Sequence, residues 1–142
     1  MKILLDTNLL IPAALYENGV CAKAYNKAIN DKNCIVVVCT HSMEEFLNSC
    51  NRKFSNKMSK IQLFLSNIFL KIKLIRTPSE KEKIPEEELI RDIDDRPILR
   101  AAVAANVDII VTGDKDFLES GIKKPKILTP AEFINFDSGI EV

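Results

Sequence analysis

The stretch that decides the fold is Ile35-Val36-Val37-Val38-Cys39, a run of β-branched and apolar residues. Side chains alternate between the two faces of a strand, so this run is apolar on both faces. Such a run is typical of a central strand in a parallel sheet that helices cover on both sides. Two shorter apolar runs, residues 2–5 and 109–112, indicate further buried strands.

Helical patterns separate these runs along the chain. We expect helices over residues 9–16, 20–29, 42–51, 61–69 and 97–106, and a terminal helix opened by Thr129-Pro130-Ala131-Glu132. Residues 71–76 are predicted to form an edge strand, 126–128 a short strand, and 77–88 a loop. Strands that alternate with helices predict an α/β fold: a three-layer α/β/α sandwich with a mostly parallel central sheet, in one domain over 1–142.

The composition is that of a globular protein. Of the 142 residues, 46% are hydrophobic and 28% are charged, which excludes a disordered tail or a coiled coil as the main structure. No apolar run reaches the roughly 20 residues of a membrane-spanning helix. Asp6 and Asn8 interrupt the first apolar run, and no small-residue cleavage site follows. We therefore expect no secretory signal, no membrane association and a cytoplasmic location.

The formal net charge is zero, but the charges are unevenly distributed. Residues 51–76 include seven basic and no acidic residues, whereas residues 80–95 include eight acidic and three basic ones. A basic face beside an acidic pocket would suit a polyanion held near a metal ion. A solvated helix face beside a charged loop would give the same pattern, and charge alone favours that simpler interpretation.

Several other kinds of site lack the residues they need. The cysteines, Cys21, Cys34, Cys39 and Cys50, include no C-x-x-C pair, and His41 is the one histidine, so we expect no structural zinc site. Cys34 and Cys39 lie among apolar residues, as buried free thiols do. The chain has no G-x-S-x-G elbow and no glycine-rich phosphate loop. These absences disfavour serine or cysteine hydrolases and nucleoside-triphosphate binding.

Acidic residues recur close to the carboxyl ends of the predicted strands. One directly follows the first strand, another lies about one helical turn after the second, and two follow strand 109–112. A further acid precedes the helix that leads into strand 109–112. Ligands of open parallel sheets bind at this edge, so we expect the acids to meet there. In chain order they are Asp6, Glu45, Asp95, Asp114 and Asp116.

Carboxylates that gather in one place repel one another unless a cation neutralises them. A set of oxygen ligands without cysteine or histidine suits Mg²⁺ or Mn²⁺. Such ions bind phosphates, activate water and stabilise the charge on attacking and leaving oxygens. The pattern therefore points to hydrolysis of phosphodiester bonds.

Each of these acids also has a purely structural interpretation. Asp6, Asp95 and Asp114 could each cap the helix that follows it. Ser42-Met43-Glu44-Glu45 matches a capping box, in which the Glu45 carboxylate accepts from the backbone of Ser42. We expect Asp92, Asp94 and the glutamates of residues 80–88 to be solvated loop residues. No single acid is decisive, and the hypothesis depends on their recurrence at strand ends.

Five segments together resemble the PIN domain (PilT N-terminus nuclease) family. They cover residues 1 to about 136, and the similarity is greatest to the toxin components of prokaryotic toxin–antitoxin pairs, the VapC-like group. The first segment and the one around Gly113 are fairly specific in combination. The segments are Leu4-Leu5-Asp6-Thr7-Asn8, Glu44-Glu45-Phe46-Leu47, Asp92-Ile93-Asp94-Asp95, Ile110-Val111-Thr112-Gly113-Asp114-Lys115-Asp116-Phe117 and Ile127-Leu128-Thr129-Pro130-Ala131-Glu132-Phe133.

The resemblance implies a metal-dependent ribonuclease that uses Mg²⁺ or Mn²⁺. It carries the catalytic, metal-binding set onto Asp6, Glu45, Asp95 and Asp114. It makes Asp116 an accessory acid, and Asn8 and Thr112 polar groups that orient the carboxylates. Glu44 could replace Glu45, and Asp92 or Asp94 could replace Asp95.

The resemblance also implies partners: an RNA substrate, an antitoxin protein and a second copy of the chain in a homodimer. We expect Arg52, Lys53 and Lys57 to contact the RNA backbone. Two other functions stay open at this point. One is an RNA-binding or regulatory protein of the same fold without turnover, and the other is a haloacid-dehalogenase-type phosphatase, which would need a second aspartate where this chain has Asn8.

Overall fold

A computed structural model describes residues 1–137 of the chain. Its centre is a five-stranded sheet in the order β3-β2-β1-β4-β5, and every pair of neighbours is parallel. The predicted α/β architecture with a parallel sheet is confirmed. The strands are β1 (Lys2–Leu5), β2 (Ile35–Cys39), β3 (Lys73–Ile75), β4 (Ile109–Val111) and β5 (Lys126–Leu128).

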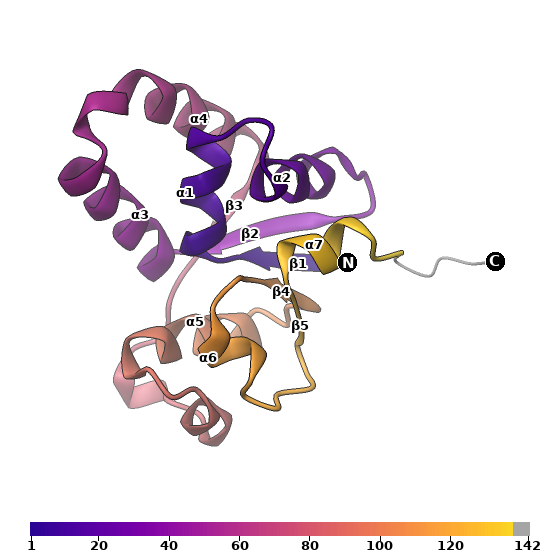
Figure 1. Cartoon of the computed structure of the whole chain (residues 1–142). Helices are drawn as coiled ribbons and strands as arrows, with labels where there is room; N and C mark the ends of the chain where they lie inside the picture. The colour runs from indigo at the N-terminus through magenta and orange to yellow at the C-terminus, as the bar shows by residue number, and fades with distance from the viewer. Residues whose placement is uncertain (138–142) are drawn as a thin grey trace.

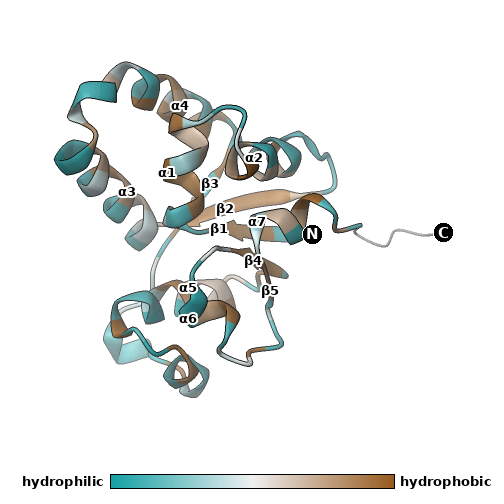
Figure 2. Cartoon of the chain, viewed as in Figure 1, coloured by the Kyte–Doolittle hydropathy of each residue, from teal (hydrophilic) through white to brown (hydrophobic). Residues whose placement is uncertain are grey.

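Alternate residues of each strand pack into two separate cores, which makes the molecule three-layered (Figure 1). Ile3 and Leu5 of β1 point into the core beneath five helices, and Leu4 points into the core on the opposite side. Figure 2 shows β1 and β2 in the hydrophobic colour along their length, as expected for strands covered on both faces. The covering helices have mixed colours because only one face of each is buried.

The first core is covered by α1 (Thr7–Leu15), α2 (Val20–Asn30), α3 (Thr40–Lys53), α4 (Met58–Lys71) and α7 (Pro130–Ile134). The second core is covered by α5 (Arg96–Ala104) and α6 (Lys115–Leu118). Each predicted helix is present, with shifted ends. The most consequential shift is in α3, which begins at Thr40 and not near Ser42.

The stretch between β3 and α5 is more ordered than the predicted loop. It contains short 3-10 helices, Glu80–Glu82, Pro85–Leu89 and Ile93–Asp95. The prediction that its glutamates are solvated is wrong for Glu87, which is buried and receives hydrogen bonds from Arg100 Nε at 2.9 Å and Nη2 at 2.6 Å. Arg100 also donates to the Pro78 carbonyl at 3.0 Å. This buried ion pair holds the middle of the segment against α5.

None of the helices in residues 1–137 combines the length and the apolar character that a membrane span requires.

Candidate metal and nucleic-acid site

Strand order and register bring the predicted acids to one edge of the sheet, which we call the acidic edge. β1 is central, with β2 on one side and β4 on the other. The chain runs outward from β1 through β2 to β3, then crosses to the other side of β1 to form β4 and β5, so the strand order switches between β1 and β4. Leu5 lies beside Val111 in the register of these two strands, so the residues that follow them meet. This switch point is where open parallel sheets bind ligands.

Asp6 is the most buried of these acids, with 4% of its surface exposed. One carboxylate oxygen accepts from the backbone N–H of Thr7 at 2.7 Å, and the other accepts from Thr112 Oγ1 at 2.7 Å. Both donors are uncharged, so they do not balance the charge of a buried carboxylate. The pKa of Asp6 is accordingly raised to about 6: burial, with the charges of Glu45 and Asp114, raises it, and the two hydrogen bonds act in the opposite direction.

Asn8 and Thr112 form the polar link between β1 and β4. Thr112 Oγ1, which donates to Asp6, accepts from the backbone N–H of Asp114 at 3.0 Å. Asn8 Oδ1 accepts from the backbone N–H of Gly113 at 3.2 Å. These contacts link the Asp6 carboxylate and the Asn8 side chain to the main chain of Gly113 and Asp114. The orienting role of Asn8 and Thr112 stays a prediction.

Glu45 lies on α3 and faces α1. Thr7 Oγ1 lies 3.3 Å from Glu45 Oε1 and 3.0 Å from the Ser42 carbonyl oxygen. The capping-box interpretation of Glu45 is wrong, because α3 begins before Ser42 and its N-cap, Cys39, makes no side-chain cap. Glu45 is therefore free to face the acidic edge. Partial burial raises its pKa, as do the charges of Asp92 and Asp94, while nearby His41 acts in the opposite direction.

Asp95 is half-buried at the start of α5 and makes no cap hydrogen bond there, so the capping alternative fails for this residue. The pKa of Asp95 is raised to about 8, most by burial, with a hydrogen bond to Asp114 and the charges of Asp114, Asp6 and Asp92 acting in the same direction. Asp114, by contrast, does cap α6: its Oδ1 accepts from the backbone N–H of Asp116 at 3.0 Å. A capping carboxylate keeps further lone pairs, so this contact is compatible with a second role.

Three carboxylates lie close together: Asp92, Asp95 and Asp116 each place an oxygen within 4.8 Å of the others. Only Asp95 among them belongs to the predicted set of four ligands, although Asp92 is one of its predicted alternatives and Asp116 a predicted accessory acid. Asp116 also accepts from Arg91 Nε at 2.9 Å and Nη2 at 2.6 Å. Oxygen donors from several segments, with raised pKa values at Asp6, Glu45 and Asp95, fit a hard divalent cation.

Other predicted residues lie further from this edge. Glu44 is exposed, whereas the neighbouring Glu45 contacts Thr7. Arg52, Lys53 and Lys57 are exposed at the end of α3 and in the turn after it. Arg52 is seven residues after Glu45, which is roughly 10 Å along a helix axis. A polynucleotide carries a phosphate on every nucleotide, so different phosphates of one strand can lie at the acids and at these basic residues.

His41 also lies at this edge, although it is not among the residues predicted for the site. Its Nε2 atom lies 2.9 Å from the carbonyl oxygen of Asp94 and 3.8 Å from Glu45 Oε1. The sequence signal was present, because His41 and Glu45 are four residues apart and therefore share one face of a helix. The contact with Asp94 could not be found, because it joins segments 53 residues apart.

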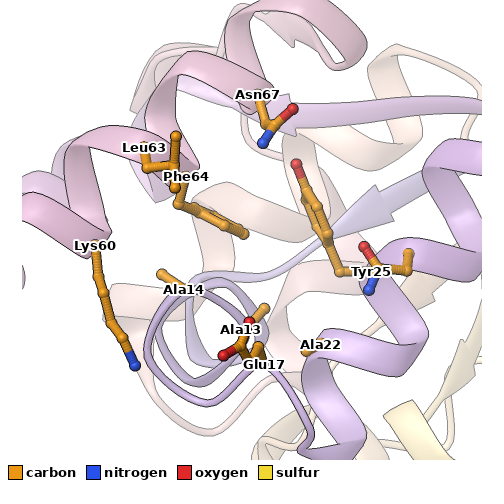
Figure 3. Close-up of a pocket in the computed structure, with 10 residues that line it drawn as sticks. Ala13, Ala14, Glu17, Ala22, Tyr25, Lys60, Leu63, Phe64 and Asn67 are labelled. Atoms are coloured by element: carbon orange, nitrogen blue, oxygen red, sulfur yellow. The ribbon is translucent and has the colours of Figure 1, made fainter.

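A groove of about 480 Å³ lies away from the acidic edge, between α4 on one side and α1 and α2 on the other (Figure 3). Ala13, Ala14 and Ala22 line it on the side of α1 and α2. Tyr25 and Phe64 stack against each other with ring centroids 4.7 Å apart. The Tyr25 hydroxyl is buried and makes no hydrogen bond in the described structure, and burial raises its pKa to about 12.

Comparisons with known proteins agree with this architecture. A family model described as "PIN domain" matches residues 2–116. No curated protein matches the sequence. One similar solved structure is VapBC2 from Rickettsia felis bound to a DNA fragment from its promoter, with a TM-score of 0.66 and 21% identity. That match covers 91% of this chain and 98% of the other.

Two further structures have a TM-score of 0.57. VapC20 of Mycobacterium tuberculosis, a toxin that cleaves the sarcin-ricin loop, is 15% identical, and the match covers 84% of this chain and 95% of that one. VapBC-1 from nontypeable Haemophilus influenzae is 14% identical, with coverage of 91% and 96%. At these identities the neighbours establish the fold.

Proposed function

The chain belongs to the PIN domain family, and from that premise we propose that it is a metal-dependent ribonuclease, the toxin component of a toxin–antitoxin pair. The observation that carries the proposal is the acidic edge, where Asp6, Glu45 and Asp95 have raised pKa values. Acids buried without compensation are unfavourable for a fold unless something binds there. The sarcin-ricin loop toxin with the same fold supports RNA as the substrate.

Asp6, Glu45, Asp95 and Asp114 would hold the divalent ion, Mg²⁺ or Mn²⁺, with Asp92 and Asp116 able to contribute oxygens. The ion would supply positive charge that lowers the pKa of a bound water and offsets the charge of the scissile phosphate. Thr112 orients Asp6 through the 2.7 Å hydrogen bond, and Thr7 orients Glu45. Asn8 fixes the Gly113 turn that carries Asp114. Such supporting contacts keep carboxylates in position before any ligand arrives.

The RNA backbone would cross from the acidic edge to the end of α3. Arg52, Lys53 and Lys57 are exposed there, in a stretch of residues 51–76 without an acid. Phosphate contacts of this kind position a polynucleotide without reading its sequence.

An antitoxin would bind the groove between α1, α2 and α4 as an amphipathic helix with acidic flanks. Lys60, Leu63, Phe64 and Asn67 line one wall at helical spacing, and Leu63 is 70% exposed. Apolar grooves of this form take the apolar face of a helix. The basic stretch around α4 disfavours a second copy at this face, because like charges would meet. Homodimerisation through another face stays a prediction.

The groove is tested by co-expression with any small protein that a neighbouring reading frame encodes. Leu63→Glu, which adds a negative charge and removes apolar area, should weaken the complex by at least roughly tenfold. Ile35→Glu, at another exposed apolar residue, serves as the matched control and should leave binding unchanged. Equal binding by both variants would exclude this groove.

The ribonuclease is tested with labelled single-stranded and stem-loop RNA in the presence of Mg²⁺, Mn²⁺ or a chelator. Wild-type protein should cleave only with the metal, and Asp6→Asn should lose cleavage by about 100-fold or more while its circular dichroism stays native. RNA binding without cleavage under all these conditions would favour the alternative, a non-catalytic RNA-binding protein. Metal-independent cleavage, or unchanged cleavage by Asp6→Asn, would contradict the assignment.

A further inference from the structure

His41 joins the two walls of the acidic edge. One wall is α3, which carries Glu45, and the other is the segment that ends in Asp92, Asp94 and Asp95. The imidazole Nε2 lies 2.9 Å from the Asp94 carbonyl oxygen, which can only accept, so Nε2–H is the donor. The same nitrogen lies 3.8 Å from Glu45 Oε1.

The backbone of His41 is held by the other end of the same segment. Its N–H donates to Thr77 Oγ1 at 3.0 Å, and Thr77 N–H donates to Thr40 Oγ1 at 3.2 Å. The first turn of a helix has unpaired N–H groups, and the N-cap Cys39 makes no side-chain cap hydrogen bond. Thr77, from another segment, therefore supplies the side-chain cap of α3, and this contact fixes the position of the His41 backbone.

The two contacts bind both ends of one connection. The chain from Thr77 to Asp95 contains no strand and no α-helix, only 3-10 helices. Arg100 anchors its middle through Glu87 and Pro78. Near Asp94 the side-chain support from α3 is the His41 hydrogen bond.

We propose that His41 is a positioning residue that sets the separation between Glu45 and the carboxylates of Asp92 and Asp95. Its effect on metal binding rests on the function proposed above, whereas its effect on the segment does not. The imidazole ring lies between α3 and this segment, and its Nε2–H fixes the direction of the Asp94 carbonyl. Asp92 Oδ1 accepts from the N–H of Asp94 at 3.0 Å. This N–H and the Asp94 carbonyl lie on either side of the Asp94 Cα, so displacing Asp94 also disturbs its contact with Asp92.

Substitutions of His41 separate the donor from the ring. His41→Gln keeps an N–H donor at the end of a side chain of similar reach, His41→Phe keeps a ring without a donor, and His41→Ala removes both. Glu82→Gln is the matched control, since it breaks the exposed Arg76–Glu82 pair in the same connection, away from the acids. We expect His41→Ala and His41→Phe to change amide exchange and Mn²⁺ affinity to a similar extent, and His41→Gln to keep both near their wild-type values.

Hydrogen exchange of the metal-free protein gives the first readout. Amides of residues 92–95 should exchange roughly fivefold faster in His41→Ala and His41→Phe, the effect of losing one hydrogen bond. They should be unchanged in His41→Gln and Glu82→Gln. Unchanged exchange in His41→Ala, or equal acceleration in His41→Gln, would overturn the proposal.

Mn²⁺ binding followed by electron paramagnetic resonance gives the second readout. The dissociation constant should rise roughly tenfold in the Ala and Phe variants, as for other residues that support metal ligands, and should stay near wild type in His41→Gln. Wild-type protein that binds no Mn²⁺ would refute the proposed function, and the exchange experiment would still decide the role of His41. Wild-type affinity in His41→Ala would overturn the positioning role.

Discussion

Within residues 1–137, two carboxylates, those of Glu87 and Asp6, are buried in opposite electrostatic environments. Glu87 lies beside Arg100, which donates two hydrogen bonds to it, and this contact lowers the pKa of Glu87. Asp6 is equally inaccessible, yet its hydrogen bonds come from a backbone N–H and a hydroxyl, and its pKa rises to about 6. The first carboxylate has its counter-charge within the chain, and the second does not.

The difference indicates which region the fold uses for itself. A buried acid paired with arginine fixes one segment to one helix, as Glu87 does for the connection before α5. A buried acid without a nearby positive charge lowers the free energy of unfolding of the metal-free protein. Binding of a cation beside it raises that free energy again. The difference supports the proposal that the acidic edge binds a cation, whereas the Glu87–Arg100 pair holds the connection before α5 in place.

Removing the positive charge beside Glu87 should have the largest effect on stability. Arg100→Met should lower the free energy of unfolding by about 3–5 kcal/mol, because Glu87 would be left buried and unpaired. The double variant Glu87→Gln with Arg100→Met should recover part of that loss. Urea unfolding at pH 7 measures both. A loss below about 1 kcal/mol in the single variant would show that the pair is not needed.

The pH dependence of the metal-free protein should separate the two regions. Asp6 has a folded pKa of about 6 against an ordinary 3.8, so the folded state holds its proton more tightly and stability falls as the pH rises through 6. Asp6 alone should account for about 1–2 kcal/mol between pH 5 and pH 8. Asp95, with a pKa of about 8, acts in the same direction.

Glu87 has the opposite sign, since its lowered pKa gives stability that is lost as the pH falls through that value. Unfolding in urea with a chelator should therefore show greatest stability near pH 4 and a decline from there to pH 8. Asp6→Asn should be more stable than wild type at pH 8 and reduce the decline above pH 5. A wild-type protein whose stability rises from pH 5 to pH 8 would contradict the raised pKa values.

The smallest effect concerns the exposed cations. Lys53→Ala and Lys57→Ala should weaken RNA binding uniformly across sequences, and each should reduce the salt dependence by about 0.7 in slope for a single strand. Filter binding at several salt concentrations measures this. Lys123→Ala, an exposed lysine in the stretch before β5, is the control. An unchanged slope for both variants would place the RNA elsewhere.

Most of the fold could be predicted from the sequence, because local signals and tertiary burial agree there. The run 35–39 is a strand covered on both faces, and the order of elements led to the parallel sheet. Ends were less predictable: Ser42 and Glu45 match a capping box, but α3 begins two residues earlier, at Thr40. Thr77 supplies the missing cap from another segment, which a local pattern cannot reveal.

The candidate site could be predicted in part for the same reason. Asp6 and Asp114 follow strands, so register alone brings their segments together. The close group of Asp92, Asp95 and Asp116 depends on how an irregular connection folds back onto α6, and spacing does not encode that. Glu87 looked like one of several solvated glutamates because its partner, Arg100, is 13 residues away.

The carboxylates of the acidic edge should share a divalent cation, because Asp6 and Asp95 lack a counter-charge within the described residues. Isothermal titration of Mn²⁺ into the metal-free protein at pH 7.5, in two buffers of different ionisation enthalpy, tests this directly. We predict saturable binding that releases protons, because Asp95 is partly protonated at that pH, and much weaker binding by Asp6→Asn and Asp95→Asn. Absence of saturable binding, or equal binding by these variants, would contradict the account.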